Sequence, residues 1–247
     1  MRRFPETALK KLAIAAFYLA LWQGLASLVG RSLLLPGPFE TIERLVALFS
    51  EGAAWAAGMT LLRILSGYLL GIAAGVLLAW LTARSRLMDA LLRPLRAVVK
   101  ATPVTSFILL ALLWLSSGLV PVCIAFLMTL PIVWANVHEG LVNVDAQLLE
   151  MARVFRLTRW KRIREIEIPS VLPQFLAACT TALGFAWKSG VAAEVIAVPR
   201  HAVGSALYLS KLTLETADLF AWTLLVILLS MLLEALLVRL LGRIRHD

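Results

Sequence analysis

The segment DAQLLEMARVFRLTRWKRIREIEIPSVLP, which runs from Asp145 to Pro173, decides how the rest of the chain is interpreted. It is basic and amphipathic, and long apolar stretches lie on both sides of it. Its cations cannot lie in hydrocarbon, and its interleaved apolar side chains need a surface to rest on. Two interpretations follow: a loop helix lying at the lipid surface, and a docking element for a soluble partner.

The composition indicates a membrane protein around this segment. Of 247 residues, 61% are hydrophobic, which is more than a soluble domain of this size needs. We predict an all-α membrane protein in a single domain, residues 1–247, with about six transmembrane helices. The spans are expected at about 12–29, 59–83, 103–115, 120–137, 171–198 and 219–238, with the basic loop at about 145–169.

The distribution of charge predicts the orientation. Most of the 24 lysines and arginines lie before the first span, from Arg84 to Lys100, in the basic loop, or in the C-terminal tail. The opposite side would hold Arg31, Arg44, Arg200 and Lys211. The positive-inside rule then places both termini and the basic loop in the cytoplasm. The net charge of +9 follows from this topology, so it does not call for a nucleic-acid partner.

The N-terminal apolar run is predicted to be a retained span. It follows basic residues but lacks a small-x-small cleavage site before a polar mature chain, so it does not resemble a signal peptide. In the second predicted span, Gly67, Gly71 and Gly75 recur at every fourth position. Small residues at this spacing let another helix approach closely, so we expect helix packing there.

The sequence shows no motif for covalent chemistry. Nothing matches G-x-x-x-x-G-K-[ST], G-x-G-x-x-G or G-x-S-x-G, and neither zinc-ligand spacing nor a pair of carboxylates in one span is found. We therefore predict no catalytic residue, no metal site and no cofactor bound by this chain. If the protein drives uphill transport, a partner must supply the energy.

Two charged residues within the fifth predicted span need an explanation, since ionised groups are costly in hydrocarbon. Lys188 and Glu194 are six residues apart and so lie on different faces of a regular helix. Each either pairs with a neighbouring helix or snorkels to the interface, or Lys188 lines a pathway and attracts an anionic solute. The candidate pathway residues are Lys188, Asn136, Trp134, Thr181 and Glu194.

The spacing in the basic loop resembles that of a known family. Glu150 and Ala152, followed at a fixed gap by the Ile-Glu-Ile-Pro run that ends at Pro169, are similar to the "EAA" loop of ABC importer permeases. That loop forms a short helix that fits into a cleft of the ATPase subunit, which favours docking over a plain surface loop. The residues expected to contact the ATPase are Glu150, Met151, Ala152, Arg153, Phe155, Arg156, Leu157 and Thr158.

The loop departs from the family pattern at two positions. Met151 replaces the second residue of the motif, and Arg156 stands where glycine is usual. A glycine there would end the short helix in a left-handed turn, so Arg156 leaves the local backbone open at this point.

The resemblance extends over nearly the whole chain, to the nitrate/sulfonate/taurine branch of these permeases. It includes the Leu-Pro-Gly-Pro run that ends at Pro38, the segment that begins at Thr60, and Ala192-Ala193-Glu194. It implies a type I importer fold in the plasma membrane of a prokaryote, paired with a second copy of itself. Two cytoplasmic ATPases would use ATP and Mg²⁺, and a solute-binding protein outside would deliver a small anion or a vitamin precursor.

Three alternatives remain at this point. An ion-coupled secondary transporter would show inverted repeats and charged side chains near mid-membrane, and only Lys188 is clearly deep. A membrane scaffold protein would explain a docking loop but not a solute pathway. An intramembrane enzyme is disfavoured by the missing catalytic motifs.

Overall fold

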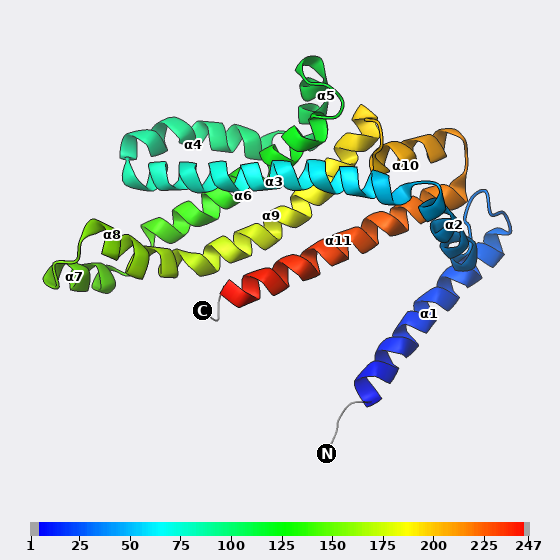
Figure 1. The fold of residues 1–247 in the computed structure, drawn as a ribbon, viewed down its shortest axis with the longest axis horizontal. Coiled ribbons are helices and arrows are strands. Elements are labelled where there is room, and N and C mark those ends of the chain that lie inside the picture. The colour runs from blue at the N-terminus through cyan, green and yellow to red at the C-terminus, as the bar shows by residue number, and fades with distance from the viewer. Residues whose placement is uncertain (1–4, 245–247) are drawn as a thin grey trace.

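A computed structural model describes residues 5–244, and within that range the regular structure is entirely helical (Figure 1). A central layer is formed by α3, α6 and α9, with α4 beside α3 and α11 beside α9, while α1 diverges from the bundle (Figure 1). The elements are α1 Pro5–Val29, α2 Pro38–Ser50, α3 Ala53–Arg84, α4 Arg86–Ala101, α5 Val104–Trp114, α6 Val120–Val142, α7 Ala146–Val154, α8 Arg159–Arg162, the π-helix η1 Ile163–Glu167, α9 Ile168–Ala197, α10 Val203–Leu212 and α11 Thr216–Ile244.

The closest helix pair is α3 and α6, and the three spaced glycines make it possible. A Cβ added at Gly67 would lie 2.2 Å from the carbonyl oxygen of Val122. One added at Gly71 would lie 2.6 Å from the Cβ of Thr129, and one at Gly75 would meet α6 as closely as 2.9 Å. No side chain fits at these distances, so the prediction of close packing at the glycines is confirmed.

The same contacts show that α3 and α6 run in the same direction. Gly67 lies against Val122, and Gly75, two turns further along α3, lies against Val133. Residue numbers therefore rise together along the two helices. The chain between them must return to the side where α3 began, and α4 and α5 provide that return.

The central helix α9 runs against both of them. Its first turn meets α6 near the end of α6, where Gly140 packs on Val171. Its last third meets the first half of α3, where Gly190 packs on Ile64. The basic loop, which connects α6 to α9, therefore lies at the same end of the bundle as the end of α3 (Figure 1).

Within the described residues, four helices are long and apolar enough to cross a membrane: Ala53–Arg84, Val120–Val142, Arg159–Ala197 and Thr216–Gly242. They contain or overlap the predicted spans at 59–83, 120–137, 171–198 and 219–238. The first predicted span, 12–29, falls within α1, whose apolar part is Ala13–Val29.

The predicted third span, 103–115, corresponds to the short helix α5, Val104–Trp114. This helix has 11 residues, or about 16 Å, which is half of the hydrocarbon thickness. The rest of the return is α4, whose cations we counted among those of the cytoplasmic side, and the two helices meet at an angle of 103°. The cations of α4 lower its mean hydropathy, so hydropathy alone does not mark it as part of a span. Pro103 separates α4 from α5.

On the opposite side from the basic loop, an ion pair fastens α2 to the start of α11. The guanidinium of Arg44 donates to both carboxylate oxygens of Asp218, at 2.5 and 2.7 Å. These bonds raise the pKa of Arg44 above its ordinary value. Phe39, Ile42 and Val46 lie along one exposed face of α2, as expected of an amphipathic helix at a membrane surface.

The glycine contacts predict a position-specific effect on stability. We expect Gly71→Ala to lower the free energy of unfolding by about 1–3 kcal/mol, because the new methyl group would overlap Thr129. Gly58→Ala, on the same helix, is the control: nothing lies within 4 Å of its added Cβ. It should leave stability unchanged or raise it. Thermal unfolding of the purified protein measures both, and equal midpoints would contradict the close packing of α3 on α6.

Candidate functional site: a basic docking loop and an intramembrane cavity

The short helix α7 forms the first half of the basic loop, and both of its ends are capped. At its start, the Asp145 side chain accepts a hydrogen bond from the backbone N–H of Gln147 at 2.8 Å. At its end, the N–H of Leu157 donates to the carbonyl of Ala152 at 2.9 Å, and that of Arg156 to Arg153 at 3.0 Å. This pair of bonds is a Schellman motif, which fixes where the helix stops.

The Schellman motif places Arg156 in the left-handed region, with φ of 51°. This is the position where glycine is usual, and the structure shows that arginine makes the same turn. A side chain with a Cβ is strained in this conformation, by about 1 kcal/mol or more. The turn is therefore kept at some cost to stability, which indicates that the stopping point of α7 matters.

The second half of the loop joins α9 through a π-helix. Thr158 caps α8, and five residues of π-helix, Ile163–Glu167, lead into α9. A π-turn inside a helix is uncommon and frequently marks a functional site. Here its last two residues, Ile166 and Glu167, begin the Ile-Glu-Ile-Pro run, and Glu167 is only 6% exposed.

Glu167 fastens the loop to the end of α3. Its carboxylate accepts a hydrogen bond from the guanidinium of Arg84, the last residue of α3. It also accepts one from Nε of Arg162 in α8, at 3.0 Å. Because a buried carboxylate left without partners is strongly destabilising, this ion pair holds the loop and α3 together.

The free surface of α7 is largely apolar. Met151, Val154 and Phe155 are 44%, 78% and 71% exposed, and Trp160 nearby is 69% exposed. Of the predicted docking residues, Glu150, Met151, Arg153, Phe155, Arg156 and Thr158 are exposed, Leu157 is half-buried and Ala152 is buried. An apolar patch rimmed by charged residues, at the end of the bundle, has the character of a protein interface.

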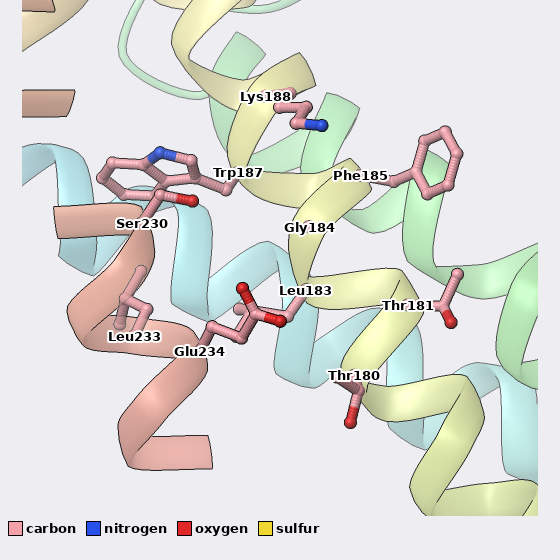
Figure 2. A pocket seen from close by; sticks show the side chains of 10 residues that line it. All are labelled: Thr180, Thr181, Leu183, Gly184, Phe185, Trp187, Lys188, Ser230, Leu233 and Glu234. Carbon is pink, nitrogen blue, oxygen red and sulfur yellow. The ribbon is translucent and has the colours of Figure 1, made fainter. Parts of the chain in front are cut away.

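A second feature is a cavity of about 380 Å³ between α9 and α11. Figure 2 shows Trp187 of α9 and Glu234 of α11 on either side of the space between these helices. Two of the predicted pathway residues, Lys188 and Thr181, belong to its lining. The residues that line it are Thr180, Thr181, Leu183, Gly184, Phe185, Trp187, Lys188, Ser230, Leu233 and Glu234.

Lys188 belongs to a polar stripe along α9. Gln174, Thr181 and Lys188 are seven residues apart, so they lie on one face of the helix, and all three are exposed. Lys188 forms no ion pair within residues 5–244, and in Figure 2 it points away from Glu234. It lies nine residues, or about 14 Å, before the end of α9. At that depth the stripe is unsuited to lipid.

The sequence did not single out Trp187, Ser230 or Glu234 as members of this cavity. Glu234 carried a usable signal, because a carboxylate in a predicted span is uncommon. Trp187 carried none, yet its buried indole N–H has no hydrogen-bond partner in the described part of the chain.

The remaining pathway candidates lie elsewhere. Asn136 is exposed on α6, and its amide donates to the carbonyl of Ile132 at 2.8 Å. Trp134 is 1% exposed and donates to Oγ1 of Thr82 at 3.0 Å, which is the environment of a packing residue.

Glu194 is fully buried, and both oxygens of its carboxylate accept hydrogen bonds. It accepts hydrogen bonds from Thr60 Oγ1 at 2.8 Å and from the backbone N–H of Gly204 at 3.1 Å. The guanidinium of Arg63 completes the set at 3.4 Å and also donates to two backbone carbonyls beyond α9. Glu194 therefore joins α3, α9 and α10, and its geometry is that of a structural ion pair rather than of a surface open to solute.

The fold and the loop correspond to a described family. The model for the "binding-protein-dependent transport system inner membrane component" matches residues 67–246. The chain belongs to this family, which identifies it as a permease component of an ABC importer system.

Three relatives have names that state a function. A riboflavin transport system permease protein, RibX, of Chloroflexus aurantiacus is 29% identical over 97% of this chain and 92% of its own. A putative aliphatic sulfonates transport permease, SsuC, of Bacillus subtilis is 28% identical over 76% of this chain and 69% of its own. The nitrate import permease NrtB of Synechococcus elongatus is 25% identical over 72% of this chain and 68% of its own.

A solved structure shows the same fold. The crystal structure of an amino acid ABC transporter with histidines aligns with a TM-score of 0.65 and 16% identity, covering 81% of this chain and 96% of that one. The predicted resemblance to an ABC importer permease is thus confirmed, and neither a secondary transporter nor a scaffold protein is favoured.

The strained turn at Arg156 gives a direct test of the loop geometry. We expect Arg156→Gly to raise the free energy of unfolding by roughly 1 kcal/mol, because glycine adopts positive φ without steric cost. Arg156→Ala removes the same charge but keeps the Cβ, so it should bring no such gain. Thermal unfolding distinguishes them, and equal midpoints for the two variants would show that the turn is not strained.

Proposed function

We propose that this chain is the membrane subunit through which a cytoplasmic ATPase drives uptake of a small anionic solute. The observation that carries the proposal is the basic loop, in which α7 presents an exposed apolar patch and Glu167 of η1 fastens the loop to α3. A helix that served only as a surface loop would not need both features. The chain itself is non-catalytic and holds no cofactor, while the ATPase uses ATP and Mg²⁺.

The proposed assembly has two copies of this chain, two ATPases and an extracytoplasmic solute-binding protein, in the plasma membrane of a prokaryote. Each chain crosses the membrane six times, with α1 as the first crossing and the bent pair α4–α5 as the third. Both termini lie in the cytoplasm. This topology follows from placing the basic loop on the cytoplasmic side.

The structure offers two routes for force to enter the membrane. When the ATPases close on ATP, they would draw the two α7 helices together. The ion pair between Glu167 and Arg84 would transmit that movement to the end of α3. The continuous backbone from η1 would transmit it to α9, which carries the polar stripe with Lys188.

The solute is proposed to be an anion because Lys188 is the cation of that stripe. Two relatives are named for aliphatic sulfonates and nitrate, which are anions. The polar groups beside Lys188, from Thr181 and Ser230, could donate hydrogen bonds to anionic oxygens.

Docking is tested by recovery of the ATPase with the purified permease. We expect Glu150→Arg to reduce the recovered ATPase at least about tenfold, which corresponds to roughly 1.4 kcal/mol. The control is Glu43→Arg, the same change at an exposed residue of α2 on the far side of the bundle. If Glu150→Arg and Glu43→Arg recover equal amounts of ATPase, α7 is not the docking element.

The pathway is tested in proteoliposomes that contain the permease, its ATPase and its binding protein. We expect Lys188→Met to lower uptake at least about tenfold, since an anion would lose its counter-charge, while the amount of bound ATPase is unchanged. Lys188→Arg keeps the charge and should retain most of the uptake. Unchanged uptake by Lys188→Met would remove Lys188 from the pathway.

A further inference from the structure

Charged and apolar residues lie on opposite sides of the helix α4. Charged residues recur at every third or fourth position, so they share one side. They are Arg86, Asp89, Arg93, Arg96 and Lys100. The opposite side is apolar and exposed, and consists of Leu87, Leu91, Leu95 and Val98. We call the first set the α4 charged row.

The charged row starts at the cytoplasmic end of the bundle and extends to mid-membrane depth. Arg86 directly follows the turn after α3, beside the residue that pairs with Glu167. From there α4 lies along α3, antiparallel to it (Figure 1). From Arg86 to Lys100 the row covers about 21 Å of helix, or two thirds of a hydrocarbon layer of about 30 Å.

Arg96 provides an independent measure of depth. Its guanidinium carbon lies 5.4 Å from the centre of the Trp134 ring, a cation–π contact. Trp134 is eight residues, or about 12 Å, before the end of α6, and its backbone packs against Gly75 of α3. Arg96 therefore lies well inside the bundle, and Lys100 lies a further turn from the cytoplasm.

A polar network fixes this position of α4. Oγ1 of Thr82 accepts from Trp134 and lies 2.9 Å from Nδ1 of His138. Nε2 of His138 lies 4.0 Å from Asp89, which accepts from Arg93 at 2.6 Å. The network connects α3, α4 and α6, so the orientation of the charged row is specified by the structure.

The only acid in the row is Asp89, and it is paired with Arg93. Arg86, Arg96 and Lys100 have no carboxylate within ion-pair distance in the described part of the chain. Arg86 and Lys100 are exposed. Unpaired cations at membrane depth cannot face lipid, whereas the leucine side of α4 can.

We propose that the α4 charged row lines the solute pathway and attracts the anionic group of the solute, such as a sulfonate, a carboxylate or an oxyanion. The inference rests on the proposed transport function and adds a second cationic surface to Lys188. A cavity of about 860 Å³, lined by Arg84, Arg86, Arg93 and His138 among others, continues the row to the cytoplasmic end. Cations at several depths give an anion successive weak sites, which suits release into the cytoplasm.

The experiment measures access of water-borne reagents and does not require the solute. The permease–ATPase complex is placed in lipid nanodiscs with cysteine introduced as Lys100→Cys or Val98→Cys. These positions are at nearly the same depth on opposite sides of α4, and Val98 is 60% exposed. The probes are the anionic sulfonatoethyl methanethiosulfonate and the cationic trimethylammonium-ethyl methanethiosulfonate. The parent chain, with Cys123 and Cys179, gives the background rate.

We expect the anionic probe to modify Lys100→Cys at least about tenfold faster than it modifies Val98→Cys. At Lys100→Cys, the anionic probe should also react faster than the cationic probe. Adding Arg96→Gln to Lys100→Cys should lower the ratio of anionic to cationic rates about threefold or more.

Three results would overturn the proposal. Equally slow modification at both positions would mean that the row is sealed from water. Equally fast modification would mean that α4 lies in the cytoplasm. Fast modification of Lys100→Cys alone, without preference for the anionic probe, would remove the attraction for anions. Recovery of the ATPase with each variant shows whether the complex is intact. A variant that retains the ATPase but gives one of these three results contradicts the pathway proposal and leaves the docking proposal unaffected.

Discussion

The close, parallel packing of α3 on α6 is the constraint on which the rest of the structure depends. Three glycines remove the side chains that would keep these helices apart, and the backbone of one then touches the other. Because the two helices run the same way, the segment between them has to cross back. That requirement makes α4 run back along α3, although its sequence alone resembles a soluble amphipathic helix.

The basic loop depends on the same arrangement. Parallel α3 and α6 end at one side of the bundle, where α9 begins, so the ends of three helices meet there. Glu167 uses this meeting point, since it pairs with Arg84 of α3 and with Arg162 of the loop. The proposed docking role would need a rigid connection at this place, because a slack loop would absorb the movement of the ATPase before it reached the membrane helices.

The four long apolar helices and the close contact of α3 with α6 could be predicted from the sequence, because each rests on local composition or spacing. The sequence did not reveal that α4 and α5 form a bent pair, since cations lower the hydropathy of α4 and the contacts that orient them are non-local. The backbone conformation at Arg156 could not be predicted from the sequence. Arginine intrinsically disfavours the left-handed region, and only the Schellman hydrogen bonds hold it there. The partner of Glu194 could not be found either, as Arg63 lies 131 residues away.

Charged residues at membrane depth fall into two groups here, and their hydrogen bonding separates them. Glu194 is fully buried and every oxygen is satisfied, so moving a solute past it would first require breaking the joint between α3, α9 and α10. Lys188 and Lys100 are exposed and unpaired within the described chain. The cost of such groups in lipid has to be offset by water or a partner. A charged group with all its hydrogen-bond partners in the protein therefore holds the bundle together. A charged group without such partners is free to meet a solute, whatever its charge or depth.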